Sequence, residues 1–371
     1  MKLLNASGMA AGYTLGLDTD ARERLVVAVK GTFSLPRRGD TAPPRLLEEQ
    51  VPLADADTFT GEPSRSATIV ECDFVPMKPR CDILLNGSAY ALGGGLAQRV
   101  VVGLQFGAMQ KAFTVWGDRV WEAGVTGASP SQPRPFTRLP ISYDNAFGGV
   151  DDFSPFAEEH RSYLPNPVGR GWHRLTQREL VDGKPVSNTE EQSDPVTRPN
   201  GNHRPMAFGA VGRNWQHRIP LAGTYDQHWQ DNVFPFLPQD FDPAYFQCAP
   251  PDQQVQTPRG GERVLIVGMT EDGRRDFALP GVEVPVVFFR RRGERAEMQA
   301  TLDTVLFEPD AERFSMVWRA SLPLERDIFE IVQILVGRMS RGWWRAMELG
   351  KTYYPSLSAA VREKRQEETL A

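Results

Sequence analysis

The segment Pro205–Gln254 most constrains the fold of this chain, because it combines many aromatic residues with many prolines. It reads PMAFGAVGRNWQHRIPLAGTYDQHWQDNVFPFLPQDFDPAYFQCAPPDQQ. Aromatic side chains in such numbers are expected to be buried, whereas prolines remove backbone donors and interrupt long helices and central strands. Long loops inside compact domains are usually functional or disordered, and the aromatic content argues against disorder. We therefore predict a well-packed irregular insert that depends on a surrounding scaffold.

Short runs rich in β-branched and aromatic residues lie on both sides of this insert and are separated by turn-forming residues. Such runs are typical of strands in antiparallel hairpins that stack as a sandwich. The predicted strands are Arg24–Leu35, Thr68–Val75, Cys81–Leu92, Val100–Phe106, Lys111–Val115, Val120–Trp121, Arg263–Met269, Val284–Phe289, Met298–Phe307 and Arg313–Ala320. We predict a mainly β fold with an antiparallel sandwich-like core. Residues 1–322 are expected to form one domain, interrupted by the irregular Pro-rich and aromatic segment at about 128–260.

The last part of the chain has a different pattern, which predicts a helical extension over residues 323–371. In the segment Leu324–Met339, LERDIFEIVQILVGRM, apolar residues recur at the spacing of an amphipathic helix, and Gly342 is expected to end it. Ser356–Glu368 is highly charged and predicts a second, exposed helix.

Charge, cysteines and hydropathy exclude several classes of protein. The chain has 42 basic and 47 acidic residues, so no overall positive field would attract nucleic acid. The three cysteines, Cys72, Cys81 and Cys248, contain no CxxC pair and favour unpaired thiols in a reducing compartment, which indicates the cytoplasm. We find no export signal in the first residues and no apolar run of the roughly 20 residues that span a bilayer.

No motif for catalysis, metal or cofactor binding is recognisable, and we predict none of these sites. The five histidines form no HExxH pattern, and no GxSxG motif marks a nucleophile. Gly93-Gly94-Gly95 lacks the features of a phosphate-binding loop, and Arg290-Arg291-Arg292 is more typical of a solvated strand end.

Aspartates near aromatic residues leave one enzymatic alternative open. Paired acids beside aromatic rings on a β-sandwich are found in glycoside hydrolases, since sugars stack on aromatic faces and hydrolysis needs two carboxyl groups. The same acids are common as turn and cap anchors, which is the reading we favour. The candidates are Asp144, Asp151, Asp152, Asp226, Asp240 and Asp242.

Several ordered stretches of the chain resemble one known family. They include GDRVWEAG (Gly117–Gly124), RPFTRLPISYDNAFGGVD (Arg134–Asp151), NPVGRGW (Asn166–Trp172), FGAVGRNWQHR (Phe208–Arg218), LAGTYDQHW (Leu221–Trp229), LPQDFDPAYFQCAPPDQQ (Leu237–Gln254), GGERVLIVGM (Gly260–Met269) and LDTVLFEPD (Leu302–Asp310). In these residues the chain resembles domain-of-unknown-function family 2169 (DUF2169), over about Asn5 to Leu322.

The resemblance implies a role in bacterial type VI secretion. Members of that family accompany toxic effectors that contain a PAAR domain, and they are thought to stabilise the effector and help to load it onto the VgrG spike. The resemblance therefore implies a non-enzymatic chaperone or adaptor, with a PAAR-domain effector and VgrG as partners. A structural component of the spike is a further alternative.

Four aromatic residues that follow the predicted helix are candidate contacts for a partner, because aromatic residues are enriched in binding hot spots. An alternative is that they pack the helix onto the sandwich. They are Trp343, Trp344, Tyr353 and Tyr354.

Overall fold

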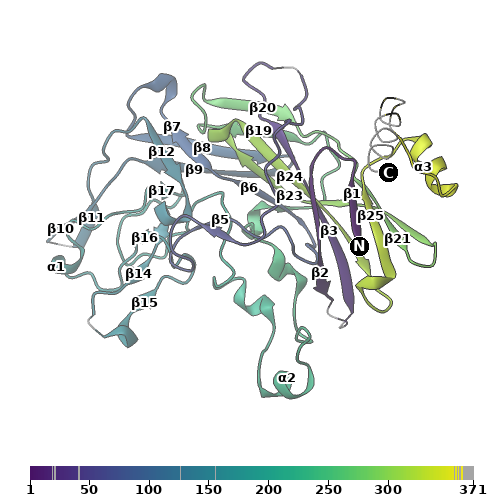
Figure 1. The fold of residues 1–371 in the computed structure, drawn as a ribbon. Helices are drawn as coiled ribbons and strands as arrows, with labels where there is room; N and C mark the ends of the chain where they lie inside the picture. The colour runs from purple at the N-terminus through teal and green to yellow at the C-terminus, as the bar shows by residue number, and fades with distance from the viewer. Residues whose placement is uncertain are drawn as a thin grey trace.

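The computed structural model describes residues 1–371 except 19, 21, 41, 126, 155, 355, 357, 359–360 and 362–371. The fold is mainly β, as predicted, and three larger sheets make up most of it (Figure 1). The six-stranded sheet has the order β18 (Gln254–Val255), β6 (Cys81–Leu85), β23 (Thr301–Glu308), β24 (Arg313–Pro323), β3 (Glu23–Ser34) and β2 (Ala10–Leu17). The five-stranded sheet has the order β17 (Thr189–Glu190), β9 (Met109–Trp116), β8 (Arg99–Phe106), β19 (Arg263–Val267) and β20 (Arg274–Ala278). The four-stranded sheet has the order β1 (Lys2–Asn5), β25 (Ile331–Val336), β21 (Pro285–Arg290) and β22 (Arg295–Gln299).

Shorter elements connect and flank these sheets. The two-stranded pairs are β4 (Thr58–Phe59) with β5 (Thr68–Val70), β7 (Gly87–Tyr90) with β12 (Arg138–Ile141), β10 (Trp121–Gly124) with β11 (Gly127–Pro130), β13 (Phe147–Gly148) with β16 (Arg170–Gly171), and β14 (Val150–Asp151) with β15 (Arg161–Ser162). The α-helices are α1 (Arg178–Val181), α2 (Gln227–Asn232) and α3 (Arg341–Glu348). The 3-10 helices are η1 (Leu92–Gly94), η2 (Tyr143–Asn145), η3 (Ala157–Glu159), η4 (Ile219–Ala222), η5 (Pro243–Phe246), η6 (Pro251–Gln253), η7 (Pro309–Ala311) and η8 (Ile328–Glu330).

The strand-rich regions before and after the irregular middle share their sheets, as predicted. β3 pairs with β24, β8 pairs with β19, and β6 pairs with β23. Most pairs in the larger sheets are antiparallel, whereas β6 with β23 and β1 with β25 are parallel. The residues between these strands therefore form a long excursion from one β-structure.

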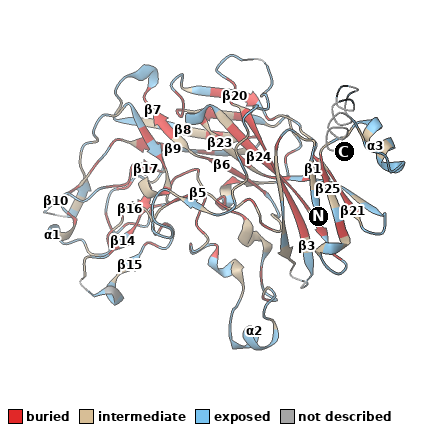
Figure 2. Cartoon of the chain, in the orientation of Figure 1, coloured by how far each residue is buried: buried red, intermediate tan, exposed pale blue. Residues whose placement is uncertain are grey.

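The main core is made of buried residues from the three larger sheets, and Figure 2 shows buried residues along their strands. Phe307 of the six-stranded sheet lies 6.5 Å from Phe106 of the five-stranded sheet, measured between ring centroids. Phe314 on β24 lies 5.5 Å from Phe277 on β20. Aromatic pairs at such distances add to the burial of apolar surface.

β3 is buried on both faces, which explains why its sequence is almost continuously apolar. Val27 and Val29 belong to the main core. Side chains alternate between the two faces of a strand, so the even-numbered residues of β3 point to the opposite face. There Lys30 forms an ion pair with Asp73 and donates to the Pro52 carbonyl at 3.3 Å. The segment around residues 50–76 therefore covers the second face of β3.

The prediction of an amphipathic helix at Leu324–Met339 was wrong, because this segment contains η8 and the strand β25. β25 pairs with β1 on one side and β21 on the other. Ile334 faces the main core and Leu335 faces a second apolar cluster. The second half of β25, Ile334–Val336, is buried on both faces, and such a stretch lacks the alternation by which strands are recognised.

The C-terminal α-helix of the structure is α3, which lies beyond the predicted helix and contains Gly342, the residue that was expected to end it. Most of the predicted second helix, Ser356–Glu368, lies outside the described residues. Two other predicted strands are each divided in two: Cys81–Leu92 into β6 and β7, and Met298–Phe307 into β22 and β23. No helix in the described part of the chain combines the length and apolar character required to cross a bilayer.

Candidate partner-binding site

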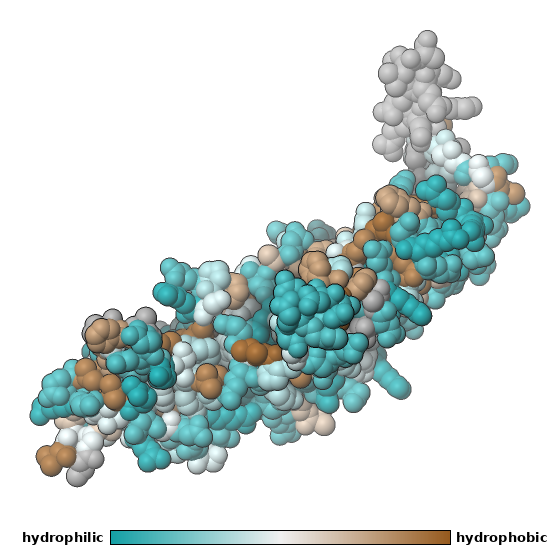
Figure 3. All heavy atoms as spheres, turned by 90° about the horizontal axis from the view of Figure 1, so that it is seen from below, coloured by the Kyte–Doolittle hydropathy of each residue, from teal (hydrophilic) through white to brown (hydrophobic). Residues whose placement is uncertain are grey.

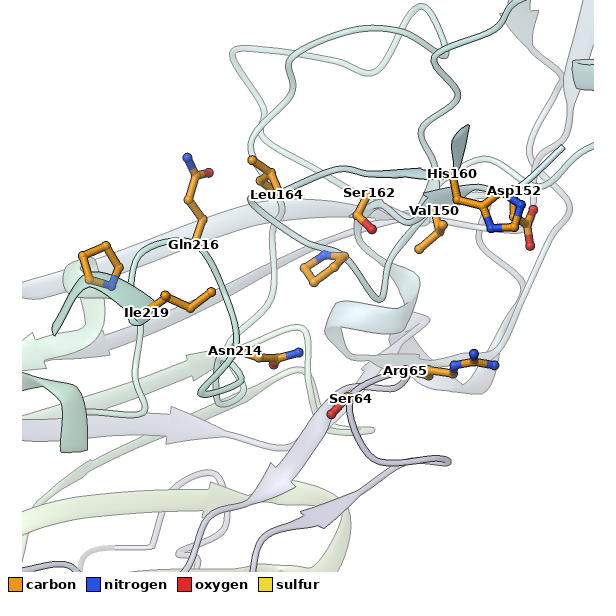
Figure 4. Close-up of a pocket in the computed structure, with 12 residues that line it drawn as sticks. Ser64, Arg65, Val150, Asp152, His160, Ser162, Leu164, Asn214, Gln216 and Ile219 are labelled. Atoms are coloured by element: carbon orange, nitrogen blue, oxygen red, sulfur yellow. The ribbon is translucent and has the colours of Figure 1, made fainter. Parts of the chain in front are cut away.

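The irregular middle of the chain borders an open cleft of about 770 Å³ (Figure 4). Its walls come from three segments: the turn at Ser64–Arg65, the β14–β15 region, and the stretch Asn214–Pro220. The residues that line it are Ser64, Arg65, Val150, Asp152, His160, Ser162, Leu164, Pro167, Asn214, Gln216, Ile219 and Pro220. A cleft of this volume is large enough to accept side chains of a partner or a small ligand.

Apolar side chains are exposed around this cleft. Leu164 is 57% exposed and Ile219 is 54% exposed, and Val150 is also exposed. A single exposed aliphatic residue is normal on a protein surface. Several around one concave surface are more informative, since such groupings are typical of interaction sites. The chemistry of the cleft is therefore mixed, with apolar groups beside uncharged and charged polar groups.

The cleft contains histidine, aspartate and serine, but its hydrogen bonds do not arrange them as a catalytic unit. The His160 ring contacts the Ser154 carbonyl oxygen through Nε2 at 2.8 Å. Among the hydrogen bonds of the described residues, none joins His160 to Ser162 or Asp152. A nucleophile needs a base within hydrogen-bonding reach, so this triplet provides no activated serine in the present geometry.

Five of the six candidate aspartates accept hydrogen bonds from backbone N–H groups. This is the anchoring role that aspartate commonly has in turns and at helix starts. The acceptors and donors are Asp144 with Ala67, Asp151 with Arg174 and Leu175, Asp226 with Trp229, Asp240 with Thr224, and Asp242 with Ala244. Asp152 is the member that lines the cleft. In the described residues, no group of three or more His, Cys, Asp or Glu could hold a metal ion.

Beside the cleft, a projecting arm carries α2 at its tip (Figure 1). We define the arm as Ile219–Phe241. Asp226 caps α2 by accepting the Trp229 N–H at 2.9 Å, and the Trp229 indole N–H donates to the Phe236 carbonyl at 2.9 Å. The Trp229 ring also packs edge-on against Tyr225 at 4.8 Å and Phe234 at 5.5 Å. The arm therefore has a small aromatic cluster of its own.

The base of the arm is closed by hydrogen bonds between its two ends. Asp240 accepts from the Thr224 backbone N–H at 2.9 Å and from its hydroxyl at 2.7 Å. These bonds, the backbone one first, lower the pKa of the Asp240 carboxyl. Partial burial raises the pKa of Tyr225.

The residue before the arm, Arg218, is a buried anchor. Its guanidinium forms an ion pair with Glu71 and donates to the carbonyl oxygens of Val211 and Tyr245, each at 2.7 Å. These partners, Glu71, Val211 and Tyr245, come from three separate segments of the chain. The arm therefore begins directly after a residue that is fixed in the core.

The aromatic segment Pro205–Gln254 therefore divides into two parts with different burial. Phe208 and Trp215 are buried in the main core, as predicted. The expectation of burial was wrong for the arm, where Tyr225 is exposed and Phe234 is 65% exposed. Figure 3 shows the molecule from below, where apolar side chains lie between hydrophilic ones. The exposed aromatic residues belong to a segment that lies outside the sheets.

The four sequence-predicted contact residues lie at α3, away from the cleft and the arm (Figure 1). Trp343 and Trp344 lie 6.4 Å and 6.1 Å from Phe289 between ring centroids and pack on the four-stranded sheet. The Ser340 hydroxyl caps the helix and donates to Tyr353 Oη at 2.9 Å. Tyr354 is exposed. These contacts show that Trp343 and Trp344 pack α3 onto the four-stranded sheet, as the alternative interpretation expected. A role of the four residues in partner binding stays a prediction.

The cleft residues Val150, Leu164 and Ile219 were missed by the sequence analysis. Their only signal was their place in the irregular middle, between Pro- and Gly-rich stretches. Hydropathy does not distinguish an exposed aliphatic residue from a buried one, because that depends on which distant segment covers it.

The model of a family described as an uncharacterized protein conserved in bacteria, DUF2169, matches residues 20–319. The chain belongs to the DUF2169 family. The match contains the cleft and the arm and leaves out β1, β2, β25 and α3. Comparison with curated proteins and with solved structures finds no match.

Proposed function

We propose that this DUF2169 protein is a non-enzymatic adaptor that binds a protein partner through the cleft and the arm. The observation that carries the proposal is the grouping of exposed apolar residues at these two adjoining features, which meet at Ile219. Aromatic residues are enriched in protein interfaces, and the buried centre of an interface is more apolar than its rim.

The arm supports the proposal because it is held by its own contacts. The arm is ordered by the Asp226 cap of α2, by the hydrogen bond of the Trp229 indole and by the bond from Thr224 to Asp240 at its base. Phe234 is exposed on this ordered arm. A side chain that is ordered before binding loses little conformational entropy when a partner covers it. An exposed aromatic residue on such a support is therefore a favourable anchor.

We propose further that the partner is a type VI secretion effector, most simply one with a PAAR domain, and that the adaptor delivers it to VgrG. This finer assignment rests on the family resemblance. In this role the adaptor would work in the cytoplasm before secretion, and it would need a binding surface rather than a reaction centre.

Co-expression with a PAAR-domain effector from the same genome tests the proposal. We expect a co-purifying complex that is weakened at least about tenfold by Leu164→Glu or Phe234→Glu, since a central anchor contributes about 2 kcal/mol or more. Leu96→Glu is the matched control, because Leu96 is an exposed apolar residue outside the cleft and the arm. Thermal unfolding of each variant checks that the fold is unchanged.

Two results would contradict the proposal. One is that the effector neither co-purifies nor gains solubility. The other is that the complex forms but the cleft and arm variants bind as tightly as the Leu96→Glu control, which would place the interface elsewhere.

A further inference from the structure

β2 is the last strand at one end of the six-stranded sheet, and no strand in the described part of the chain pairs with its outer edge. β3 beside it is buried from Leu25 to Phe33, whereas no residue of β2 is buried. The side chains of Tyr13 and Leu15 are exposed. The other six residues of β2 are partly exposed, so solvent reaches this strand far more than β3.

The hydrogen bonds at the end of the hairpin show which backbone groups point outward. Asp18 donates its N–H to the Arg22 carbonyl at 2.9 Å, in the same register as the β2–β3 ladder. Hydrogen-bonded pairs alternate with non-hydrogen-bonded pairs in an antiparallel ladder. The even-numbered residues of β2 therefore bond to β3. The outward N–H and C=O groups belong to Ala11, Tyr13, Leu15 and Leu17.

The other sheet ends are protected in ways that β2 is not. β20 carries an ion pair between Arg274 and Asp276, and β22 carries one between Arg295 and Glu297. Charges on an edge strand discourage pairing with another chain. β17 and β18 have only two residues each, and β1 has four. β2 is longer and reads AAGYTLGL, without a charge.

We propose that the edge of β2 binds an extended segment of the protein partner as a seventh strand. This inference rests on the adaptor function proposed above and adds how part of the partner is recognised. Main-chain hydrogen bonds would supply affinity, and alternate side chains would supply specificity. The fitting segment is uncharged, with β-branched or aromatic residues at alternate positions that pack beside Tyr13 and Leu15.

The size of the edge favours a segment of a partner over a second copy of this chain. A stable interface between two folded proteins takes about 20–30 residues on each side. Eight residues of β2 are too few for a dimer that is held by this edge alone. They suffice for an extended segment of a partner that is also held at the cleft and the arm.

Leu15→Pro tests the edge directly. It removes one outward N–H and leaves the hydrogen bonds to β3 in place, and proline is tolerated on edge strands. Leu15→Val is the matched control, because it keeps the N–H and an apolar side chain. Far-ultraviolet circular dichroism and thermal unfolding establish that both variants are folded.

The probe is a display library of random peptides of about ten residues, long enough to cover such an edge. We expect the wild-type protein to select uncharged, β-prone sequences that bind Leu15→Pro at least about tenfold more weakly, and Leu15→Val with similar affinity. The proposal is overturned if no such sequences are selected, or if they bind Leu15→Pro as tightly as wild type.

Two further measurements separate this inference from the adaptor proposal. The library does not contain the effector, so failure of selection overturns the edge inference alone, whereas failure of co-purification counts against the adaptor function. Sedimentation of the wild-type chain should give a monomer. A dimer that Leu15→Pro dissociates would assign the edge to a second copy and overturn the proposal.

Discussion

Replacing Trp215 by alanine should destabilise the whole protein, whereas the same change at Trp229 should not. Trp215 is only 2% exposed and belongs to the main core. Its ring packs edge-on against Tyr143 at 4.9 Å between centroids. Truncation of a buried tryptophan leaves a cavity and costs about 3–5 kcal/mol of unfolding free energy. This is a large share of the roughly 5–15 kcal/mol that stabilises a typical protein.

Trp229 is the matched control, because it has the same chemistry on the projecting arm. Its ring is half-buried and contacts residues of the arm, namely Tyr225 and Phe234. We expect Trp229→Ala to lower the free energy of global unfolding by about 1 kcal/mol or less, since no core cavity forms. It should loosen the arm and thereby weaken partner binding.

Urea denaturation of both variants, followed by circular dichroism, measures the difference. We expect the midpoint for Trp215→Ala to fall by roughly 1.5–2.5 M, given a loss of about 3–5 kcal/mol and a slope near 2 kcal/mol per molar urea. The reasoning is refuted if Trp229→Ala costs as much as Trp215→Ala, or if Trp215→Ala costs less than about 1.5 kcal/mol.

Three other predictions follow from buried or crowded positions. Arg218→Met should cost about 3 kcal/mol in denaturation, because the buried Glu71 then keeps only its ion pair with Arg213, and the double variant Arg218→Met/Glu71→Leu should recover most of the loss; an equally unstable double variant would contradict this. Burial lowers the pKa of the Lys111 ammonium from 10.5 to about 8. Below about pH 8 the ammonium is charged in both the folded and the unfolded chain, and burying the charge reduces the free energy of unfolding. This loss of stability disappears as the pH rises from about 8 to 10.5, because the folded chain releases the proton first. Between these two pH values the unfolding free energy of the wild type should therefore increase by up to about 3 kcal/mol relative to that of Lys111→Met. The prediction fails if the unfolding free energies of the two proteins change with pH in the same way. Gly117→Ala should cost about 2 kcal/mol or more, because its Cβ would lie 1.8 Å from a backbone carbonyl oxygen, whereas Gly103→Ala, whose nearest contact is 3.6 Å, should have little effect on the melting temperature.

The strands that could be predicted from the sequence are those whose residues carry a local signal. β3 and β8 are rich in β-branched residues and are bounded by turns, and the structure places both in large sheets. The irregular Pro-rich middle was also predictable, because proline restricts the backbone wherever it occurs. The family resemblance extended over nearly the same residues as the match to the family model, 20–319.

β25 shows where local pattern fails. Its apolar residues suit a helix at the spacing of Ile328, Ile331 and Leu335. The competing strand is stabilised by β1 and β21, which lie far away in the sequence. The register shift at Arg290 also breaks the simple alternation of its side chains. Pairing with distant strands therefore overrides the helical period.

The sequence alone determined the mainly β class, the position of the aromatic middle and the family of the chain. These depend on residue type and near-neighbour order, which act through short-range sterics and burial preference. Only the tertiary structure decided which aromatic residues are buried. Trp215 and Trp229 lie in the same segment, but Trp215 packs against Tyr143 in the core and Trp229 lies on the arm. Burial is decided by which distant residues cover a side chain, and so the cleft, the arm and the open edge of β2 exist only once the chain has folded.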